Sequence, residues 1–195
     1  MSVIHKSSHQ VETSAPVQQQ RSLTEPAKKA LAALRIAFGL TFLWAFVDKL
    51  LALGYSTGKD ATTGVVDRFG DAAWIHGGSP TEAFLAFGAK GPFKGFYNSI
   101  AGDAWADWLF MAALLGIGIA FTFGIFTRLA AAAGAVLYLM MWTVALPPDS
   151  NPVLDVHIIG LFVCLVLGLY AAGRYLGMGR RWERLPLAQR FPILK

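Results

Sequence analysis

The chain has 195 residues, of which 55% are hydrophobic and only 15% are charged, and its formal net charge is +5. Soluble globular domains carry about 25% charged residues, so this composition excludes an ordinary soluble domain. The single cysteine, Cys164, excludes an internal disulfide, a CxxC redox pair and a c-type haem attachment, and we expect it to be a small packing residue.

The hydrophobic residues are concentrated in four long runs. These runs are Leu31–Leu53, Trp108–Phe126, Leu129–Leu146 and Val156–Leu176. Each has about the length of an α-helix that crosses a bilayer, which takes roughly 17–25 residues. Four runs spread along the chain do not fit a signal peptide. The sequence therefore predicts an all-α membrane protein, a four-transmembrane-helix bundle with a structured, partly helical extracytoplasmic connection between helices 1 and 2.

The basic residues predict how this protein is oriented, because Lys and Arg in short loops favour the cytoplasmic side. They gather in the N-terminal tail, at Arg128 between helices 2 and 3, and in the C-terminal segment. The other two connections, Gly54–Asp107 and Pro147–Asp155, are net acidic. We therefore expect a cell-membrane protein in contact with lipid, with both termini cytoplasmic. Because the basic residues flank membrane spans, we expect no nucleic-acid binding.

Three regions follow from this pattern. Residues 1–25 are polar, rich in Gln and Ser and without a basic-then-apolar leader, and we expect a disordered cytoplasmic tail. Residues 26–176 form the membrane domain, and Pro26 opens its first helix. This domain includes an outer cap at residues 54–107, and residues 177–195 form a basic cytoplasmic segment.

The outer cap is too long for a plain loop and contains helix signals. Thr62 and Thr63 are predicted to cap a first short helix. Ser79 is predicted to be the N-cap of a second short helix, which Gly88 ends. The aromatic residues that follow predict a segment lying at the membrane surface.

Small residues at regular spacing predict close contacts between the helices. Helix 2 places Gly116, Ala120 and Gly124 four residues apart, and helix 3 has Ala130 and Gly134. In lipid, where burial alone gives little drive to associate, such residues allow helix backbones to approach closely. We therefore expect a compact bundle.

Ionisable residues inside the apolar runs are the main functional candidates, because placing a charge in lipid is costly. Arg35 lies near the cytoplasmic end of helix 1, and Asp48 and Lys49 lie near its outer end. Asp155 and His157 lie at the outer end of helix 4. The up-and-down topology is expected to bring these outer residues to the same depth.

This outer group suits a quinone site. A quinone needs an aromatic slot for its ring, and a His or carboxylate can exchange the proton that accompanies electron transfer. We predict that His157, Asp155 and Asp48 handle protons and that Trp44, Trp142 and Asn151 contact the quinone. No haem or metal is predicted, because a bis-histidine haem needs two His on facing helices and only His157 lies near one.

Structural explanations compete for the start of helix 4. Asn151 followed by Pro152 fits an N-cap and a first helical residue. Asp155 then favours the positive end of the helix dipole. His157 fits a packing histidine. Each of these explanations stays open beside the functional one.

The same holds for the basic residues of the spans. Lys49 fits an ion pair with Asp48 or a side chain that extends to the headgroups. Arg35 fits a contact with lipid phosphate or an inward-pointing side chain. We predict Arg35, Lys49 and Arg128 as anion-binding or structural charges.

Five stretches carry a resemblance to a known family. They are LRIAFGLTFLWAFVDKL in helix 1, WIHGGSPTEAFL and GPFKGFY in the cap, GIFTRLAA before helix 3 and MMWTVALPPDSNPVLDVHI before helix 4. They resemble the DoxX family, and more narrowly its DoxD-like branch, which includes the small membrane subunit of thiosulfate:quinone oxidoreductase. The resemblance covers about residues 31–182. Its matching positions are Arg35, Asp48, Lys49, Arg128, Asn151, Pro152, Asp155 and His157.

The resemblance implies a four-helix fold in a bacterial cell membrane and a quinone-linked redox role, with menaquinone or ubiquinone as substrate and other subunits of a membrane redox complex as partners. The net acidic outer surface argues against direct oxidation of the thiosulfate dianion, which prefers a positive funnel. We therefore expect a quinone-interacting subunit. A non-catalytic accessory or anchor subunit, and a small-solute or lipid carrier, are the alternatives, and a homo-oligomer stays open.

Overall fold

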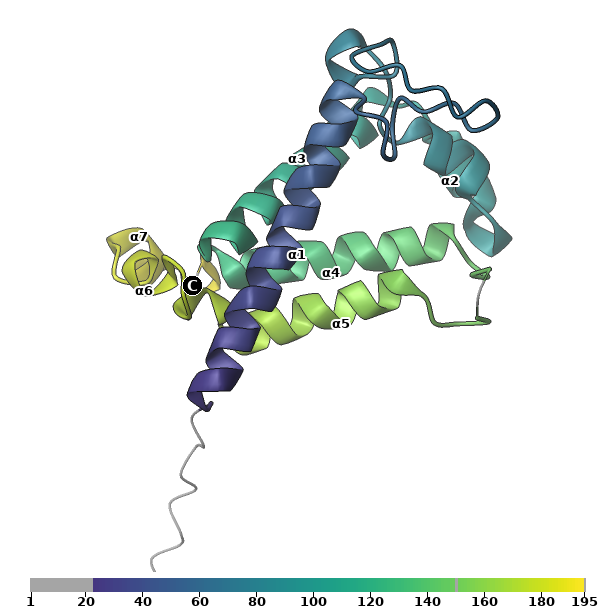
Figure 1. The fold of residues 1–195 in the computed structure, drawn as a ribbon. Coiled ribbons are helices and arrows are strands. Elements are labelled where there is room, and N and C mark those ends of the chain that lie inside the picture. Colours follow the sequence, from purple (N-terminus) through teal and green to yellow (C-terminus); the bar gives the residue numbers. More distant parts are fainter. Residues whose placement is uncertain (1–22, 150, 195) are drawn as a thin grey trace, which may run out of the picture.

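The structure, a computed structural model, describes residues 23–149 and 151–194 and is dominated by four apolar helices (Figure 1). These are α1 (Glu25–Leu51), α3 (Ala104–Phe123), α4 (Thr127–Val144) and α5 (Val156–Leu169). The first three are long and apolar enough to cross a membrane, and α5 is shorter. The chain is therefore a helical, membrane-embedded protein.

Local sequence sets the ends of the long helices. Pro26 lies in the first turn of α1, as predicted, although the helix already begins at Glu25, the last residue of the predicted tail. Residues 1–22 of that tail lie outside the described residues. Gly124 adopts the left-handed region (φ 74°) that ends α3, a conformation that glycine adopts without a steric penalty.

The fourth helix is shorter than its apolar run predicts. The run Val156–Leu176 has the length of a span, but α5 ends at Leu169. Its 14 residues extend about 21 Å, against a hydrocarbon core of about 30 Å. Ala171 then takes a left-handed conformation (φ 46°), and the 3-10 turn η4 (Ala172–Arg174) follows. Hydropathy does not reveal where the helix ends, because Ala171, Ala172 and Gly173 are residue types that also occur inside membrane helices.

The helices associate in two pairs, α1 with α3 and α4 with α5, and α3 also contacts α4. The start of α1 and the chain after α5 lie together at one end of the molecule, which we call the terminal end. The connection 54–103 lies at the opposite end, which we call the cap end. Figure 1 shows that the two pairs diverge toward the cap end.

Glycines give each pair its close contact. Gly134 was predicted for this role and Gly118 was not. Gly118 of α3 faces the backbone nitrogen of Leu43, and a Cβ built on Gly118 would lie 2.9 Å from it. A Cβ on Gly134 would lie 2.7 Å from the Cys164 sulfur, so the buried cysteine is a packing residue at this contact. Gly116 was expected at the same kind of interface, but a Cβ built on it would meet no other part of the chain within 4 Å, so it makes no close helix contact.

The cap contains only short elements. They are η1 (Trp74–His76), η2 (Phe84–Gly88), η3 (Gly91–Phe93) and α2 (Lys94–Ser99). The Glu82 amide donates to Ser79 Oγ over 3.0 Å, and the helical turn after it ends at Gly88, as predicted. The helix predicted from Thr62 or Thr63 does not form.

Asp60 explains why that helix is absent. Its Oδ1 accepts hydrogen bonds from the amides of Thr62 (3.0 Å) and Thr63 (2.6 Å), which closes a local turn. Such side-chain to backbone bonds compete with helix formation. Gly64 continues the turn with a positive φ of 72°, and Lys59 pairs with Val66 in an isolated bridge.

Buried Asp107, in the first turn of α3, ties the cap to the membrane helices. It accepts hydrogen bonds from Ser79 Oγ (2.8 Å), Thr81 Oγ1 (2.6 Å) and the Thr81 amide (3.2 Å). On the other pair, Tyr97 packs beside Val144 and bonds Thr143 Oγ1 over 2.6 Å. The cap thus holds both diverging pairs at once.

Replacing Asp107 by Ala is expected to loosen the cap. The change leaves buried Thr81 groups without their acceptor, which costs about 1–3 kcal/mol. Limited proteolysis of membranes should cut residues 54–103 faster in this variant. Asp71→Ala is the matched control, because this exposed carboxylate accepts no hydrogen bond from the described residues. Equal cleavage of the two variants would contradict this role of Asp107.

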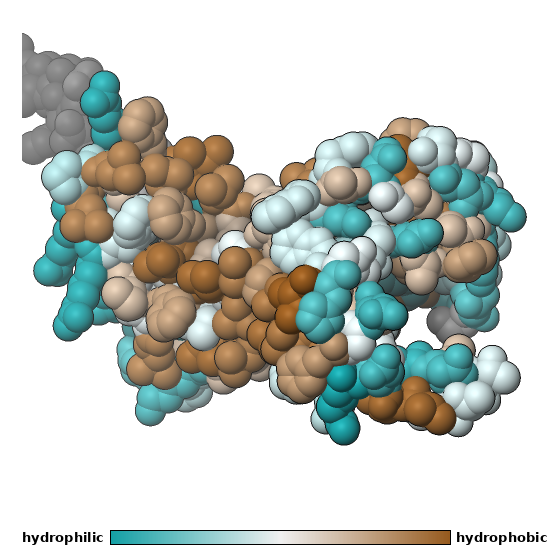
Figure 2. Space-filling view, turned by 90° about the horizontal axis from the view of Figure 1, so that it is seen from above, coloured by the Kyte–Doolittle hydropathy of each residue, from teal (hydrophilic) through white to brown (hydrophobic). Residues whose placement is uncertain are grey.

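The C-terminal segment folds back against the turn between α3 and α4. It contains α6 (Gly179–Trp182), α7 (Pro186–Arg190) and η5 (Pro192–Leu194). The Met178 amide donates to the Phe123 carbonyl over 2.9 Å, and the ring centroids of Trp182 and Phe126 lie 4.1 Å apart. Figure 2, viewed from above, shows apolar side chains over the helices between two more polar regions.

Candidate functional site

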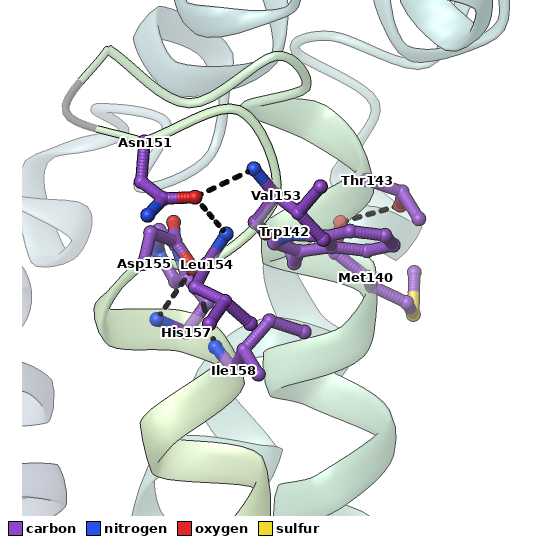
Figure 3. Close-up of polar contacts among 9 residues, drawn as sticks. All are labelled: Met140, Trp142, Thr143, Asn151, Val153, Leu154, Asp155, His157 and Ile158. Atoms are coloured by element: carbon purple, nitrogen blue, oxygen red, sulfur yellow. Dashed lines mark hydrogen bonds and ion pairs between the residues drawn. The ribbon is translucent and has the colours of Figure 1, made fainter.

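The predicted outer residues form two separate groups. Asp155, His157, Asn151 and Trp142 gather around the cap ends of α4 and α5 (Figure 3). Asp48 lies in the last turn of α1 and has other partners. Figure 1 shows that the end of α1 and the start of α5 belong to different arms of the diverging pairs.

Asp155 and His157 form an anchored pair. Asp155 Oδ2 lies 2.5 Å from His157 Nδ1, and Oδ1 accepts hydrogen bonds from the amides of His157 (3.0 Å) and Ile158 (3.2 Å). The carboxylate is therefore the N-cap of α5 and a partner of the imidazole at once. The two side chains are only 11% and 16% exposed.

The contacts of the pair indicate which of its atoms carry protons. Burial on its own raises the pKa of Asp155, but hydrogen bonds from the His157 ring and from two amides outweigh it, so the pKa lies below its ordinary value. An ionised carboxylate at Nδ1 keeps a proton on that nitrogen. Nε2 of neutral His157 then carries the lone pair and can accept a proton.

Asn151 and Trp142 shape the loop before this pair. Asn151 Oδ1 accepts hydrogen bonds from the amides of Val153 (2.9 Å) and Leu154 (3.0 Å). Asn151 therefore closes a turn, and the N-cap is Asp155 rather than the expected Asn151. Trp142 Nε1 donates to the Val153 carbonyl over 2.7 Å, which leaves its ring face for contacts.

Tyr138 is a neighbour that the sequence analysis missed. Its ring centroid lies 6.4 Å from that of His157 and 5.8 Å from that of Phe42 in α1. Gly160 makes this contact possible, since a Cβ there would lie 2.5 Å from the Tyr138 ring. The four-residue spacing of Tyr138 and Trp142, which places both on one face of α4, could have identified it.

Asp48 serves the connection that leaves α1. The carboxylate is buried and accepts hydrogen bonds from the amides of Tyr55 (3.1 Å) and Ser56 (2.9 Å) and from Ser56 Oγ (2.6 Å). Lys49 Nζ donates to the same Ser56 hydroxyl over 3.0 Å, and Trp44 packs edge-on against Tyr55 at 5.0 Å.

The predicted convergence of Asp48 with His157 therefore needs correction. No hydrogen bond or ion pair among the described residues joins Asp48 to Asp155 or His157. Equal depth in a membrane fixes a position along the helix axis but not the lateral separation of two helices. Trp44 lies with Asp48 and is thereby separated from the predicted ring contact Trp142.

Arg35 is a structural charge. It is fully buried, and its guanidinium donates to the carbonyls of Phe121 and Thr122 at the end of α3. It also donates to the carbonyls of Tyr175 (3.4 Å) and Leu176 (3.2 Å). Arg35 thus caps α3 and holds the chain after α5. Of the two alternatives for this residue, the structure has the inward-pointing side chain, because the guanidinium is buried against protein carbonyls. Arg128 is exposed in the first turn of α4.

The Asp155 cap predicts an acid-sensitive stability. Because its pKa is lowered in the folded chain, Asp155 contributes stability above the ordinary carboxyl pKa of about 4, and this contribution is lost as the pH falls through the folded value. The melting temperature of the wild type should therefore exceed that of Asp155→Asn at pH 6. The difference should shrink below about pH 4. A difference that stays constant down to pH 3 would refute the assignment.

Comparison with known proteins adds no relative. No family model, curated protein or solved structure matches this chain. The fold and the site define a membrane-embedded helical protein with a carboxylate–imidazole pair at its cap end. Membership of the DoxX family stays a prediction.

Proposed function

We propose that the chain is a quinone-interacting subunit of a membrane oxidoreductase, of the DoxX type that the sequence resembles. The observation that carries the proposal is the Asp155–His157 pair, whose imidazole is held at Nδ1 and lies near the Tyr138 ring. Trp142 lies one turn after Tyr138 on the same face of α4, and its indole is fixed by a hydrogen bond to the Val153 carbonyl. A quinone ring between aromatic side chains would place an oxygen at His157 Nε2. His157 would accept a proton during quinol oxidation and return one during quinone reduction.

In this proposal, each of the four apolar helices would cross a bacterial cell membrane once. The short α5 would cross together with the chain that follows it, or where the bilayer is locally thinned. The connection 54–103 and the Asp155–His157 pair would then lie outside, and both termini in the cytoplasm. The electrons would come from or pass to a partner subunit, and the chain would supply the quinone site.

A competitive labelling experiment tests this function. A photoreactive menaquinone analogue, added to the chain in nanodiscs, should label residues 138–142 or 153–160. Excess menaquinone should suppress that labelling. Labelling that is not suppressed, or that maps to residues 44–56 at the end of α1, would overturn the proposed site.

A non-catalytic anchor subunit is the second candidate, and the C-terminal segment favours it. Leu185, Leu187, Phe191 and Ile193 expose apolar side chains there, next to several arginines. Such a surface fits a partner protein. Purification in mild detergent would support this alternative if partners stay bound and the labelling above is absent.

A further inference from the structure

The terminal end contains a basic hollow that the proposed quinone chemistry does not use. Its volume is about 570 Å³, and a second hollow of about 250 Å³ adjoins it and shares Lys28, Arg174, Tyr175 and Arg180. The remaining lining residues are Leu23, Glu183 and Arg184 in the larger hollow, and Glu25, Lys29 and Leu176 in the smaller. The two adjoining hollows together are called the basic hollow.

Positive charge dominates this lining, with five cations against two carboxylates. Two of the cations have acidic partners, since Lys28 pairs with Glu25 at 2.7 Å and Arg174 with Glu183 at 2.8 Å. Lys29, Arg180 and Arg184 form no ion pair with a described residue. The uncompensated charge suits an anion.

The fold builds this hollow from segments far apart in the sequence. The start of α1 supplies one wall, and η4 and α6 supply the other. Arg35 fixes Tyr175 and Leu176 through their carbonyls, and the Trp182–Phe126 contact fixes α6. The cations are therefore held by the same contacts that hold the C-terminal segment.

The position of the hollow indicates the source of the anion. It lies where the apolar part of α1 begins, which is the border between hydrocarbon and water for a membrane-embedded helix. Leu176 lines the hollow and is 73% exposed, and Met178 nearby is also exposed. An apolar side chain beside clustered cations matches a ligand with a charged head and an acyl chain.

We propose that this hollow binds the phosphate group of an anionic phospholipid. Lys29, Arg180 and Arg184 contact the headgroup phosphate, and the acyl chains leave past Leu176 toward the membrane. The site is independent of the quinone proposal. It ties the C-terminal segment to the membrane surface.

A lipid titration tests the proposal. The chain is purified in mild detergent, short-chain phosphatidylglycerol is added, and native mass spectrometry measures how much lipid is bound. The double variant Arg180→Gln, Arg184→Gln should bind about 10- to 30-fold more weakly. Each basic residue near an anionic surface strengthens binding by a factor of about five, and two are removed. The matched control Arg68→Gln, Arg190→Gln removes the same charge from exposed sites outside the hollow and should bind as the wild type does.

Three outcomes would overturn the proposal. Equal weakening in the control pair would reduce the effect to net charge. Equal binding of phosphatidylcholine would remove the need for an anion. Displacement of the lipid by millimolar inorganic phosphate, with equal thermal stabilisation by phosphate alone, would make the hollow a site for free phosphate. Both double variants change only exposed side chains, and their melting temperatures report whether folding is intact.

Discussion

Replacing His157 by Gln is expected to lower the quinone-linked electron transfer that depends on this chain by about 10²- to 10⁴-fold. A general base or acid contributes an acceleration of this size, and Gln keeps a hydrogen-bonding side chain without the titrating nitrogen. The rate would be measured in membranes as quinone reduction or quinol oxidation, with membranes that lack the chain as the baseline.

Two further variants separate catalysis from structure. His76→Gln is the matched control, because this imidazole is exposed in the cap and should be dispensable. Asp155→Asn keeps a good N-cap residue but removes the charge at Nδ1, so the rate should fall while α5 remains folded. Unchanged rates in His157→Gln membranes that contain normal amounts of the protein would end the proton-transfer role.

Replacing Arg35 by Leu is expected to destabilise the whole chain by about 3–5 kcal/mol. The change leaves carbonyls of α3 and of the segment after α5 without their shared donor, inside the protein. Arg35→Lys should lose part of this stability, because an ammonium cannot bridge two sets of carbonyls as the guanidinium does.

Thermal unfolding in nanodiscs measures this effect, and cleavage after residue 176 reports whether the C-terminal segment is released. Arg128→Leu removes an exposed arginine at the same end and is the control. If Arg35→Leu has the same melting temperature as the control, and its C-terminal segment is cleaved at the same rate, the structural role assigned to Arg35 is wrong.

Hydropathy predicted the three long helices to within a few residues, because each must be apolar over its whole length. The Ser79 cap and the small-residue contact at Gly134 were also predictable, since both follow from local rules. The early end of α5 was not, because it depends on backbone conformations in an apolar run. A turn forms in place of the helix predicted at Thr62 and Thr63, because the Asp60 side chain accepts hydrogen bonds from their amides.

The candidate site was predictable only in part. The sequence located Asp155 and His157 together at the start of helix 4, but the hydrogen bond between them was not predicted, because it depends on the extended backbone of Asp155. The separation of Asp48 from that pair depends on the divergence of two helix pairs, which no local pattern encodes. The buried bonds of Arg35 likewise join positions more than 80 residues apart.

A density map of the chain in nanodiscs with added menaquinone would locate the quinone directly. We expect a quinone ring beside Tyr138 and Trp142, with one ring oxygen within hydrogen-bonding distance of His157 Nε2. A map in which the quinone ring lies at any other place, or in which lipid acyl chains fill the space beside His157, would contradict it.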